Sequence, residues 1–156
     1  MWWRLNRSQF NAGKGEGNRQ ALQDIVASGE IPGIIAYSAE RPVGWCSVGP
    51  RDAFPALNRS RILARVDDRP VWSIVCFYVA RPFRRAGLTG RLIGAAVEWA
   101  TARGAKTLEA YPVEPKSGKM PDTSAYHGMA SVFARAGFTE VARRSETRPV
   151  MRIELS

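Results

Sequence analysis

The alternation of hydrophobic and polar residues changes from strand-like to helical within one stretch of the chain, residues 71–104. Val71–Val79 consists mostly of β-branched and aromatic residues, as expected of a strand buried on both faces. Pro82 ends this run. From Leu88 onward, apolar residues recur at intervals of three and four as far as Gly104, which is a suitable helix end. The stretch therefore predicts a strand, a loop and a helix.

The loop between this strand and this helix has the composition of an anion-binding site. Gly87 and Gly90 let the backbone approach a ligand closely, Arg84 and Arg85 add positive charge, and Thr89 offers a hydroxyl. The N-terminus of a helix also presents unpaired N–H groups, which attract phosphate. The alternative is an ordinary tight connection with solvated arginines, because short glycine motifs are weak evidence by themselves.

Shorter apolar runs on both sides of this stretch predict one domain over residues 1–156, of mixed α/β structure. The expected strands lie at residues 34–38, 43–48, 107–113, 138–143 and 150–155. The last two should form an antiparallel pair. A right-handed crossover places strand 107–113 parallel to Val71–Val79. Ligands of such sheets bind beyond the carboxyl ends of the strands, so we expect a cleft near Val79, Arg84 and Pro112.

Polar and glycine-rich segments predict the remaining helices and loops. Asn18–Ser28 is expected to be a helix capped by Asn18, with four residues on its buried side: Ala21, Leu22, Ile25 and Val26. We interpret Trp2–Leu5 as a short edge strand and Gly13–Gly17 as a loop. Residues 112–124 contain three prolines and are predicted to form a mobile wall of the cleft. A helix should follow over residues 125–136.

The run Arg84-Arg85-Ala86-Gly87-Leu88-Thr89 resembles the acyl-CoA signature of the GNAT superfamily of N-acetyltransferases. That signature has Gln or Arg, two residues, Gly, one residue, and then Gly or Ala; Thr89 departs from it. The segments TLEAYPV and MASVFARAGF follow in the order that the family shows. The resemblance covers residues 30–155. It implies a central mixed sheet with a splayed parallel strand pair flanked by helices, and acetyl transfer from acetyl-CoA to an amine.

The resemblance also implies which residues hold acetyl-CoA. In this family the two parallel strands splay apart, and the pantetheine arm lies in the gap as an added strand would. The Phe77 N–H would then face the thioester carbonyl, and the backbone of Tyr78 and Val79 would line the pantetheine arm. The phosphate-binding residues would be Arg84, Arg85, Ala86, Gly87, Leu88, Thr89 and Gly90.

Aminolysis of a thioester needs a donor for the oxyanion, a proton for the thiolate and a base for the amine. The Phe77 N–H is the candidate donor. Many family members use a tyrosine as the acid, and at that position this sequence has Phe133, which has no proton to give. Tyr126, two helical turns earlier on the same face, is the candidate acid; its alternative role is packing at the edge of the cleft.

Glu109 is the candidate base, because a carboxylate in the middle of a buried strand is unusual and its surroundings favour proton uptake. It could act on the amine directly or through water. Its alternative role is to pair with one of the many arginines. His127, the only histidine, and Glu114 are further candidates.

Composition agrees with a single enzyme domain: 156 residues, 45% hydrophobic. No apolar run approaches the roughly 20 residues that cross a membrane, so we expect a cytoplasmic protein. Cys46 and Cys76 are expected to be separate buried thiols, and neither they nor the single histidine suggest a metal site. A homodimer is left open.

The net charge of +9 comes mainly from arginines that are spread along the chain. Such a surface attracts CoA and other polyanions. A basic nucleic-acid-binding module is one alternative function, although the sequence shows no continuous basic stripe. An acyl-CoA-binding sensor or partner subunit without catalysis is the other, and Phe133 is its best support. The acceptor is expected to be a small amine or a peptide terminus.

Overall fold

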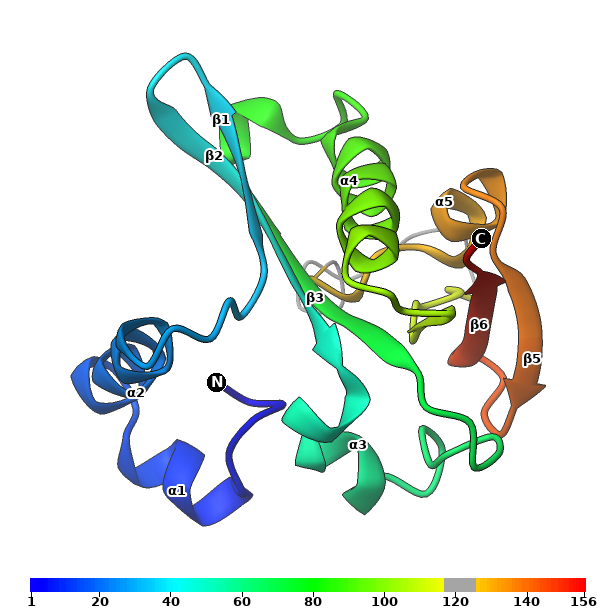
Figure 1. Ribbon diagram of the computed structural model, residues 1–156, viewed down its shortest axis with the longest axis horizontal. Coiled ribbons are helices and arrows are strands. Elements are labelled where there is room, and N and C mark those ends of the chain that lie inside the picture. The colour runs from blue at the N-terminus through cyan, green and yellow to red at the C-terminus, as the bar shows by residue number, and fades with distance from the viewer. Residues whose placement is uncertain (117–125) are drawn as a thin grey trace.

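The computed structural model describes residues 1–116 and 126–156 and is built around a six-stranded sheet (Figure 1). The strands are β1 (Ile34–Ser38), β2 (Arg41–Pro50), β3 (Trp72–Val79), β4 (Thr107–Ala110), β5 (Thr139–Arg143) and β6 (Pro149–Glu154). Their order across the sheet is β1-β2-β3-β4-β6-β5. β3 and β4 pair in parallel, whereas the other neighbouring strands are antiparallel. The predicted mixed α/β class is therefore confirmed.

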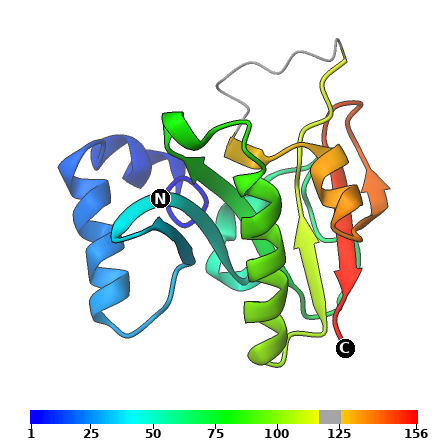
Figure 2. The ribbon, with the colours of Figure 1, turned by 90° about the horizontal axis from the view of Figure 1, so that it is seen from above.

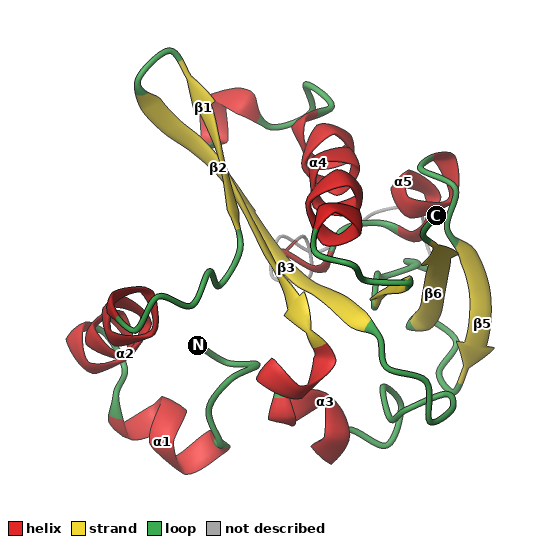
Figure 3. Ribbon diagram, viewed as in Figure 1, coloured by secondary structure: helices red, strands yellow, loops and turns green. Residues whose placement is uncertain are grey.

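Helices cover both faces of this sheet (Figure 2). They are α1 (Arg7–Ala12), α2 (Glu16–Ala27), α3 (Pro55–Arg59), α4 (Leu88–Ala102) and α5 (Ala130–Arg135). Side chains of α4 and α5 pack on one face, and α3 packs on the other together with Trp3. α1 and α2 stand apart from the strands, and no residue of either helix is buried (Figure 3).

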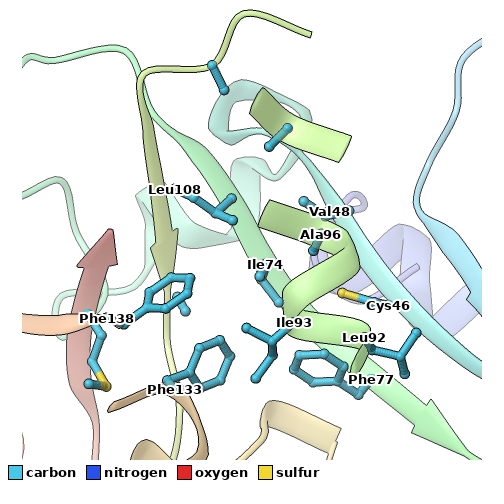
Figure 4. Close-up of a cluster of buried hydrophobic side chains, with 14 of the residues drawn as sticks. Cys46, Val48, Ile74, Phe77, Leu92, Ile93, Ala96, Leu108, Phe133 and Phe138 are labelled. Carbon is cyan, nitrogen blue, oxygen red and sulfur yellow. The ribbon is translucent and has the colours of Figure 1, made fainter. Parts of the chain in front are cut away.

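The larger core lies between the sheet and α4. Leu92 and Ile93 of α4 pack against Ile74 and Phe77 of β3, and Phe133 of α5 closes the same cluster (Figure 4). All five side chains are nearly inaccessible to solvent. Burying a side chain of this size contributes roughly 1.5–3 kcal/mol, so this cluster fixes the position of α4 on the sheet.

Gly44 of β2 lets α4 approach the sheet closely. A Cβ on Gly44 would lie 3.1 Å from Leu88 Cδ2, 3.2 Å from Leu92 Cδ1 and 3.3 Å from Ala36 Cβ. The register with β1 also shifts here, because Ala36 opposes Gly44 while Tyr37 opposes Pro42. The intervening residue of β2 is thus a bulge. A glycine in this strand signals such a bulge or close approach, and the structure has both.

β3 and β4 separate soon after they meet. Trp72–Ile74 pairs with Leu108–Ala110, but β4 ends there while β3 continues to Val79. The Ala80 N–H donates to the Val43 carbonyl of β2 at 2.9 Å. Because backbone groups alternate in direction along a strand, the N–H and C=O groups of Phe77 and Val79 point away from β2, into the gap. This is the splayed pair expected from the family resemblance.

Three predictions about the N-terminal third are wrong. Trp2–Leu5 forms turns and not a strand. The second helix begins at Glu16 after a Gly15 N-cap, and the Asn18 side chain instead donates to the Phe10 carbonyl at 2.9 Å. The expected apolar side of this helix is not buried, and Val26 is 56% exposed. α2 is thus bonded to α1 through Asn18 and buries none of its own residues.

Two predicted boundaries after α4 are also wrong. β4 ends at Ala110 and not at residue 113, although Val113 forms a parallel bridge with Met129. The last helix begins at Ala130, because Gly128 has φ +76° and Met129 is extended. Of the predicted wall over residues 112–124, residues 117–124 lie outside the described residues, as does residue 125.

Candidate active site

The loop before α4 presents a cluster of unpaired backbone donors. The first bond within the helix runs from the Arg91 N–H to the Gly87 carbonyl, at 3.3 Å. The four N–H groups of residues 87–90 have no acceptor in the described part of the chain. Gly87 caps the helix with φ +75°, and no atom lies within 4 Å of the place where its Cβ would be. Such an open, electropositive helix terminus is suited to an anionic group such as a phosphate.

Arg84 connects this loop to the gap beside β3. Its Nε donates to the Val79 carbonyl at 3.1 Å, one of the groups that point into the gap. Arg84, Arg85, Ala86 and Gly87 are all exposed, and Arg85 has a positive φ of 62°. The Thr89 N–H belongs to the set that is unpaired within the described residues. The loop and the gap thus form one continuous surface.

The far side of the gap is formed by the chain around Val113. The Glu114 N–H donates to the Thr147 carbonyl, on the side of β6. Val113 bonds on the opposite side: its N–H donates to the Gly128 carbonyl at 2.9 Å, and its carbonyl accepts from the Ala130 N–H at 3.1 Å. A Cβ on Gly128 would lie 3.2 Å from the Phe77 ring. The turn before α5 therefore reaches the side chain next to the gap-facing N–H of Phe77.

Phe133, at the position of the usual acid, is part of the core. Its ring is fully buried, with ring centroids 6.0 Å from Phe77 and 5.1 Å from Phe138. Tyr126 lies in a turn before α5 and is 39% exposed, so the prediction that both residues share one helical face is wrong. Burial raises the pKa of Tyr126, which keeps its phenol protonated. Its hydroxyl is thus in the form that an acid requires.

Glu109 lies at the centre of a buried ion-pair network on the face opposite α4. Its Oε1 accepts from Arg51 Nη1 at 3.0 Å and from the Tyr111 hydroxyl at 2.5 Å, and its Oε2 accepts from Arg152 Nε at 2.7 Å. Arg152 also binds Asp67 through two hydrogen bonds. Only 1% of the Glu109 side chain is exposed. The arginine partners that the sequence left as an alternative are therefore present.

The network also ties the parallel strands together below their point of separation. The Tyr111 hydroxyl, just after β4, lies 2.9 Å from the Ser73 hydroxyl of β3. Burial, followed by the charge of Glu109, raises the pKa of Tyr111 well above its usual value. Burial alone would lower the pKa of Arg152, but its bonds with Asp67 and Glu109 raise it. Tyr111 thus stays neutral and Arg152 stays charged near neutral pH.

His127 is buried between aromatic rings. Its ring centroid is 3.9 Å from that of Tyr126 and 5.6 Å from that of Trp3, and its Nε2 is 3.4 Å from Arg148 Nη1. Burial and then the charge of Arg148 lower the pKa of His127 to about 3. The histidine is neutral near pH 7. Glu114, the remaining candidate base, pairs with Arg143 at 2.6 Å.

A cavity of about 480 Å³ adjoins Tyr126. Its lining residues are Met1, Trp2, Trp3, Phe10, Cys76 and Tyr126. Cys76 precedes Phe77 in β3, so its side chain points to the opposite face of the sheet. No sequence motif assigns the N-terminal aromatic residues to the site.

Two kinds of feature are absent from residues 1–116 and 126–156. No helix there is long and apolar enough to cross a membrane. No group of three or more His, Cys, Asp or Glu side chains in these ranges is placed to hold a metal ion. Cys46 and Cys76 are both free thiols.

Comparison with known proteins agrees with this fold. The profile of the Acetyltransferase (GNAT) family matches residues 1–118. No curated protein sequence matches the chain. Among solved structures, the fold is similar to that of ribosomal-protein-alanine N-acetyltransferase from Brucella melitensis, with 20% identity, a TM-score of 0.55, and coverage of 90% of this chain and 78% of that one.

Two further structures have the same fold. An N-acetyltransferase from Staphylococcus aureus Mu50 has 13% identity and a TM-score of 0.58, covering 90% of this chain and 77% of its own. The yncA protein of Salmonella typhimurium, solved with its cofactor acetyl-CoA, has 16% identity and a TM-score of 0.58, covering 89% and 73%.

A splayed parallel pair, with an open helix terminus beside it, is the architecture of an acyl-CoA-dependent transferase. The chain belongs to the GNAT acetyltransferase family, as the family profile shows. The match confirms the predicted family. Because this family uses acetyl-CoA as co-substrate, the predicted co-substrate is confirmed as well.

Proposed function

We propose that this protein is an N-acetyltransferase that transfers the acetyl group of acetyl-CoA to a primary amine by direct attack in a ternary complex. The observation that carries the proposal is the unpaired N–H cluster of residues 87–90 beside the gap-facing edge of β3. Free thiols at Cys46 and Cys76 are typical of a reducing compartment, and the proposal includes a cytoplasmic location.

The loop and β3 supply the binding groups in this proposal. The N–H groups of residues 87–90 donate to the pyrophosphate, and Arg84 and Arg85 add charge at its edge. The N–H and C=O groups of Phe77 and Val79 pair with the pantetheine amides and the thioester, as those of a neighbouring strand would. Because the Arg84 Nε donor already occupies the Val79 carbonyl, ligand entry exchanges one hydrogen bond for another.

Bound acetyl-CoA supplies an activated acyl group and a thiolate leaving group. The Phe77 N–H donates to the oxygen that gains charge when the amine attacks the thioester carbonyl. As the C–S bond breaks, Tyr126 gives its phenolic proton to the leaving sulfur, and its phenolate takes up the proton that the attacking nitrogen loses as the C–N bond forms, directly or through water, so that an amide and the CoA thiol are the products. Burial raises the pKa of the Cys76 thiol, which makes this residue a poor nucleophile and favours direct attack by the amine over an acyl-enzyme.

The entry of ligands from two sides favours the ternary complex. The N-terminus of α4 lies on one face of the sheet, and the cavity next to Tyr126 lies beside Cys76, whose side chain faces the other. The two routes meet at the end of β3. Glu109 is buried in its ion-pair network, away from the residues that line the cavity, so the proposal needs no proton transfer to it.

Binding of acetyl-CoA at this loop is tested by thermal unfolding. At a ligand concentration of about 100 times Kd, binding adds roughly 2.7 kcal/mol, which for this chain length raises Tm by about 5–10 °C. Gly87→Glu places a carboxylate against the pyrophosphate and should abolish the rise. Gly104→Glu is the matched control, because Gly104 has φ +79° and equally open surroundings at the other end of α4. No rise in the wild type, confirmed by calorimetry, would refute the proposal.

The second candidate function is an acyl-CoA-binding subunit without catalysis. The fully buried phenyl ring of Phe133, where the family commonly has an acid, favours it. The two candidates differ in one measurement. The enzyme releases free CoA thiol in the presence of an amine panel, whereas the subunit shows the Tm rise and no thiol release above the rate without protein.

A further inference from the structure

The cavity beside Tyr126 has walls that are mostly aromatic. The Trp2 and Phe10 rings meet edge to face with centroids 5.2 Å apart, and Trp3 closes the cavity from the sheet side. Trp3 is only 8% exposed and packs with Phe54 and Leu57 of the second core, so this wall is anchored. The N-terminal segment that carries it lies between α2 and α3 (Figure 1).

The cavity meets the proposed reaction centre at two residues. Cys76 is the neighbour of Phe77, whose N–H points into the gap, and Tyr126 is the proposed acid. An amine placed between these residues is next to the thioester, and the group attached to the amine must then extend toward Trp2 and Phe10. The cavity is thus positioned for the acceptor and not for CoA, whose phosphates lie at the N-terminus of α4.

We propose that this cavity binds the acceptor, and that the acceptor is a primary amine with an aromatic ring a few bonds from its nitrogen. This inference rests on the proposed acetyl transfer. The ring packs against Trp2 and Phe10, since aromatic rings favour edge-to-face and offset contacts. A volume of about 480 Å³ leaves room for one such group together with the reacting amine.

The electrostatics of the cavity disfavour polycationic acceptors. None of the described residues that line it carries a carboxylate. The positive charge of Arg148 lies near Tyr126. In the described part of the chain, Arg148 contacts the Tyr111 carbonyl and His127 and has no carboxylate partner. Burial also raises the pKa of both Cys76 and Tyr126, which favours their neutral forms. The same desolvation favours the neutral, nucleophilic form of an amine.

The test compares amines with and without an aromatic ring. Binding of 2-phenylethylamine, n-butylamine and spermidine to CoA-saturated protein is measured by calorimetry, together with the dipeptides Phe-Ala and Ala-Ala. Burial of one phenyl ring predicts that phenylethylamine binds about 10- to 100-fold more tightly than butylamine. If the natural source of the ring is a peptide N-terminus, Phe-Ala should show the same preference over Ala-Ala.

Variants of the cavity wall show which residues cause the preference for an aromatic amine. Phe10→Ala and Trp2→Ala should each reduce it at least fivefold, whereas Tyr37→Ala, which removes an exposed ring of β1, should leave it unchanged. Thermal unfolding with acetyl-CoA is run on every variant. An intact Tm rise with equal affinity for both amines, or with tightest binding of spermidine, overturns this inference and leaves acetyl-CoA binding standing. Absence of the Tm rise in the wild type instead refutes the proposed function, whatever the amines do.

Discussion

Phe133 and Tyr126 decide how a proton can reach the leaving group. The phenyl ring of Phe133 is enclosed by Phe77 and Phe138 and has no proton to give. Tyr126 is partly exposed on the cavity, and burial raises its pKa, so its phenol is protonated throughout the neutral range. A side chain that donates this proton must therefore lie outside α5, the helix in which many family members carry the acid.

Tyr126→Phe tests this assignment. A hydroxyl that acts only in the transition state affects kcat and leaves CoA affinity unchanged. General acid catalysis is typically worth a factor of about 10²–10⁴, so we expect kcat to fall by at least tenfold. Tyr37→Phe, on an exposed tyrosine of β1, is the control. A smaller loss, with chemistry shown to be rate-limiting, would mean that Tyr126 only packs against the cavity.

Phe133→Tyr in the Tyr126→Phe background gives the complementary result. Recovery of kcat would show that the site accepts the arrangement common in the family. If kcat is insensitive to both changes, solvent protonates the thiolate and neither residue acts as an acid.

His127 predicts how stability depends on pH. Its pKa in the folded state is about 3, below the value near 6.5 expected for an unfolded chain. The unfolded state therefore binds a proton first as pH falls, and stability is complete above pH 6.5 and is lost toward pH 3. We expect the free energy of unfolding to fall by up to about 1.4 kcal/mol per pH unit below pH 6.

Urea unfolding between pH 6.0 and 5.0 isolates this effect. The carboxylates of Asp67, Glu140 and Glu154 have lowered pKa values and titrate at lower pH. His127→Gln should remove the slope in this window. A slope that persists in the variant would assign the pH dependence to another group.

At the scale of elements, Glu109 holds three segments together: β4, which carries it, β6 through Arg152, and the segment after β2 through Arg51. Loss of the Glu109 carboxylate leaves the buried Arg51 guanidinium without its carboxylate partner, whereas Arg152 keeps its pair with Asp67. Removing one partner of a buried pair costs about 3–5 kcal/mol. The loss of stability on replacing Glu109 therefore measures how much this network contributes to holding β3 and β4 together where they are paired.

Glu109→Gln separates the structural and catalytic roles of this residue. Urea denaturation should show a loss of about 3–5 kcal/mol, whereas Glu154→Gln, which breaks an exposed pair with Arg69, should lose less than about 1 kcal/mol. We expect kcat per folded molecule to stay within a few fold of the wild type. A fall of about 10²–10⁴ would instead support the base hypothesis for Glu109.

Elements whose sequence signals are local were predicted well. The β3 strand, the glycine loop and α4 were placed to within a residue or two, because an unbroken apolar run, helical spacing and Gly104 each act over a few residues. α1 was missed although its signal is present. The Asn6 side chain accepts from the Gln9 N–H at 2.8 Å and the Gln9 side chain accepts from the Asn6 N–H at 3.1 Å, a capping box.

Features that depend on distant contacts were not predictable in detail. Glu109 is joined to Arg51 and Arg152 across 58 and 43 positions of sequence, so the sequence suggested an arginine partner without naming it. The cavity joins Trp2 and Phe10 to Tyr126 from the other end of the chain. The helical spacing of Tyr126, Ala130 and Phe133 predicted one continuous helix. The positive φ of Gly128 instead separates Tyr126 from α5.

At the scale of the molecule, the positive charge and the two-sided site act on different ligands. The net charge of +9 attracts the phosphates of CoA from a distance, whereas the cavity beside Tyr126 recognises its ligand by contact. Salt should therefore weaken one interaction and spare the other, since it screens charge over about 10 Å at 0.1 M and about 3 Å at 1 M.

Stopped-flow and calorimetric measurements between 0.1 and 1 M NaCl test this separation. Electrostatic steering typically raises association rates by a factor of about 10–10³, so the association rate of CoA should fall at least tenfold over this range. The affinity for 2-phenylethylamine should change by less than about threefold, because burial of a neutral ring does not depend on screening. A short oligonucleotide provides the contrast: if it binds at 0.1 M salt more tightly than CoA does and competes with it, the charge serves nucleic acid, and the acetyl-CoA loop is not the principal anion site.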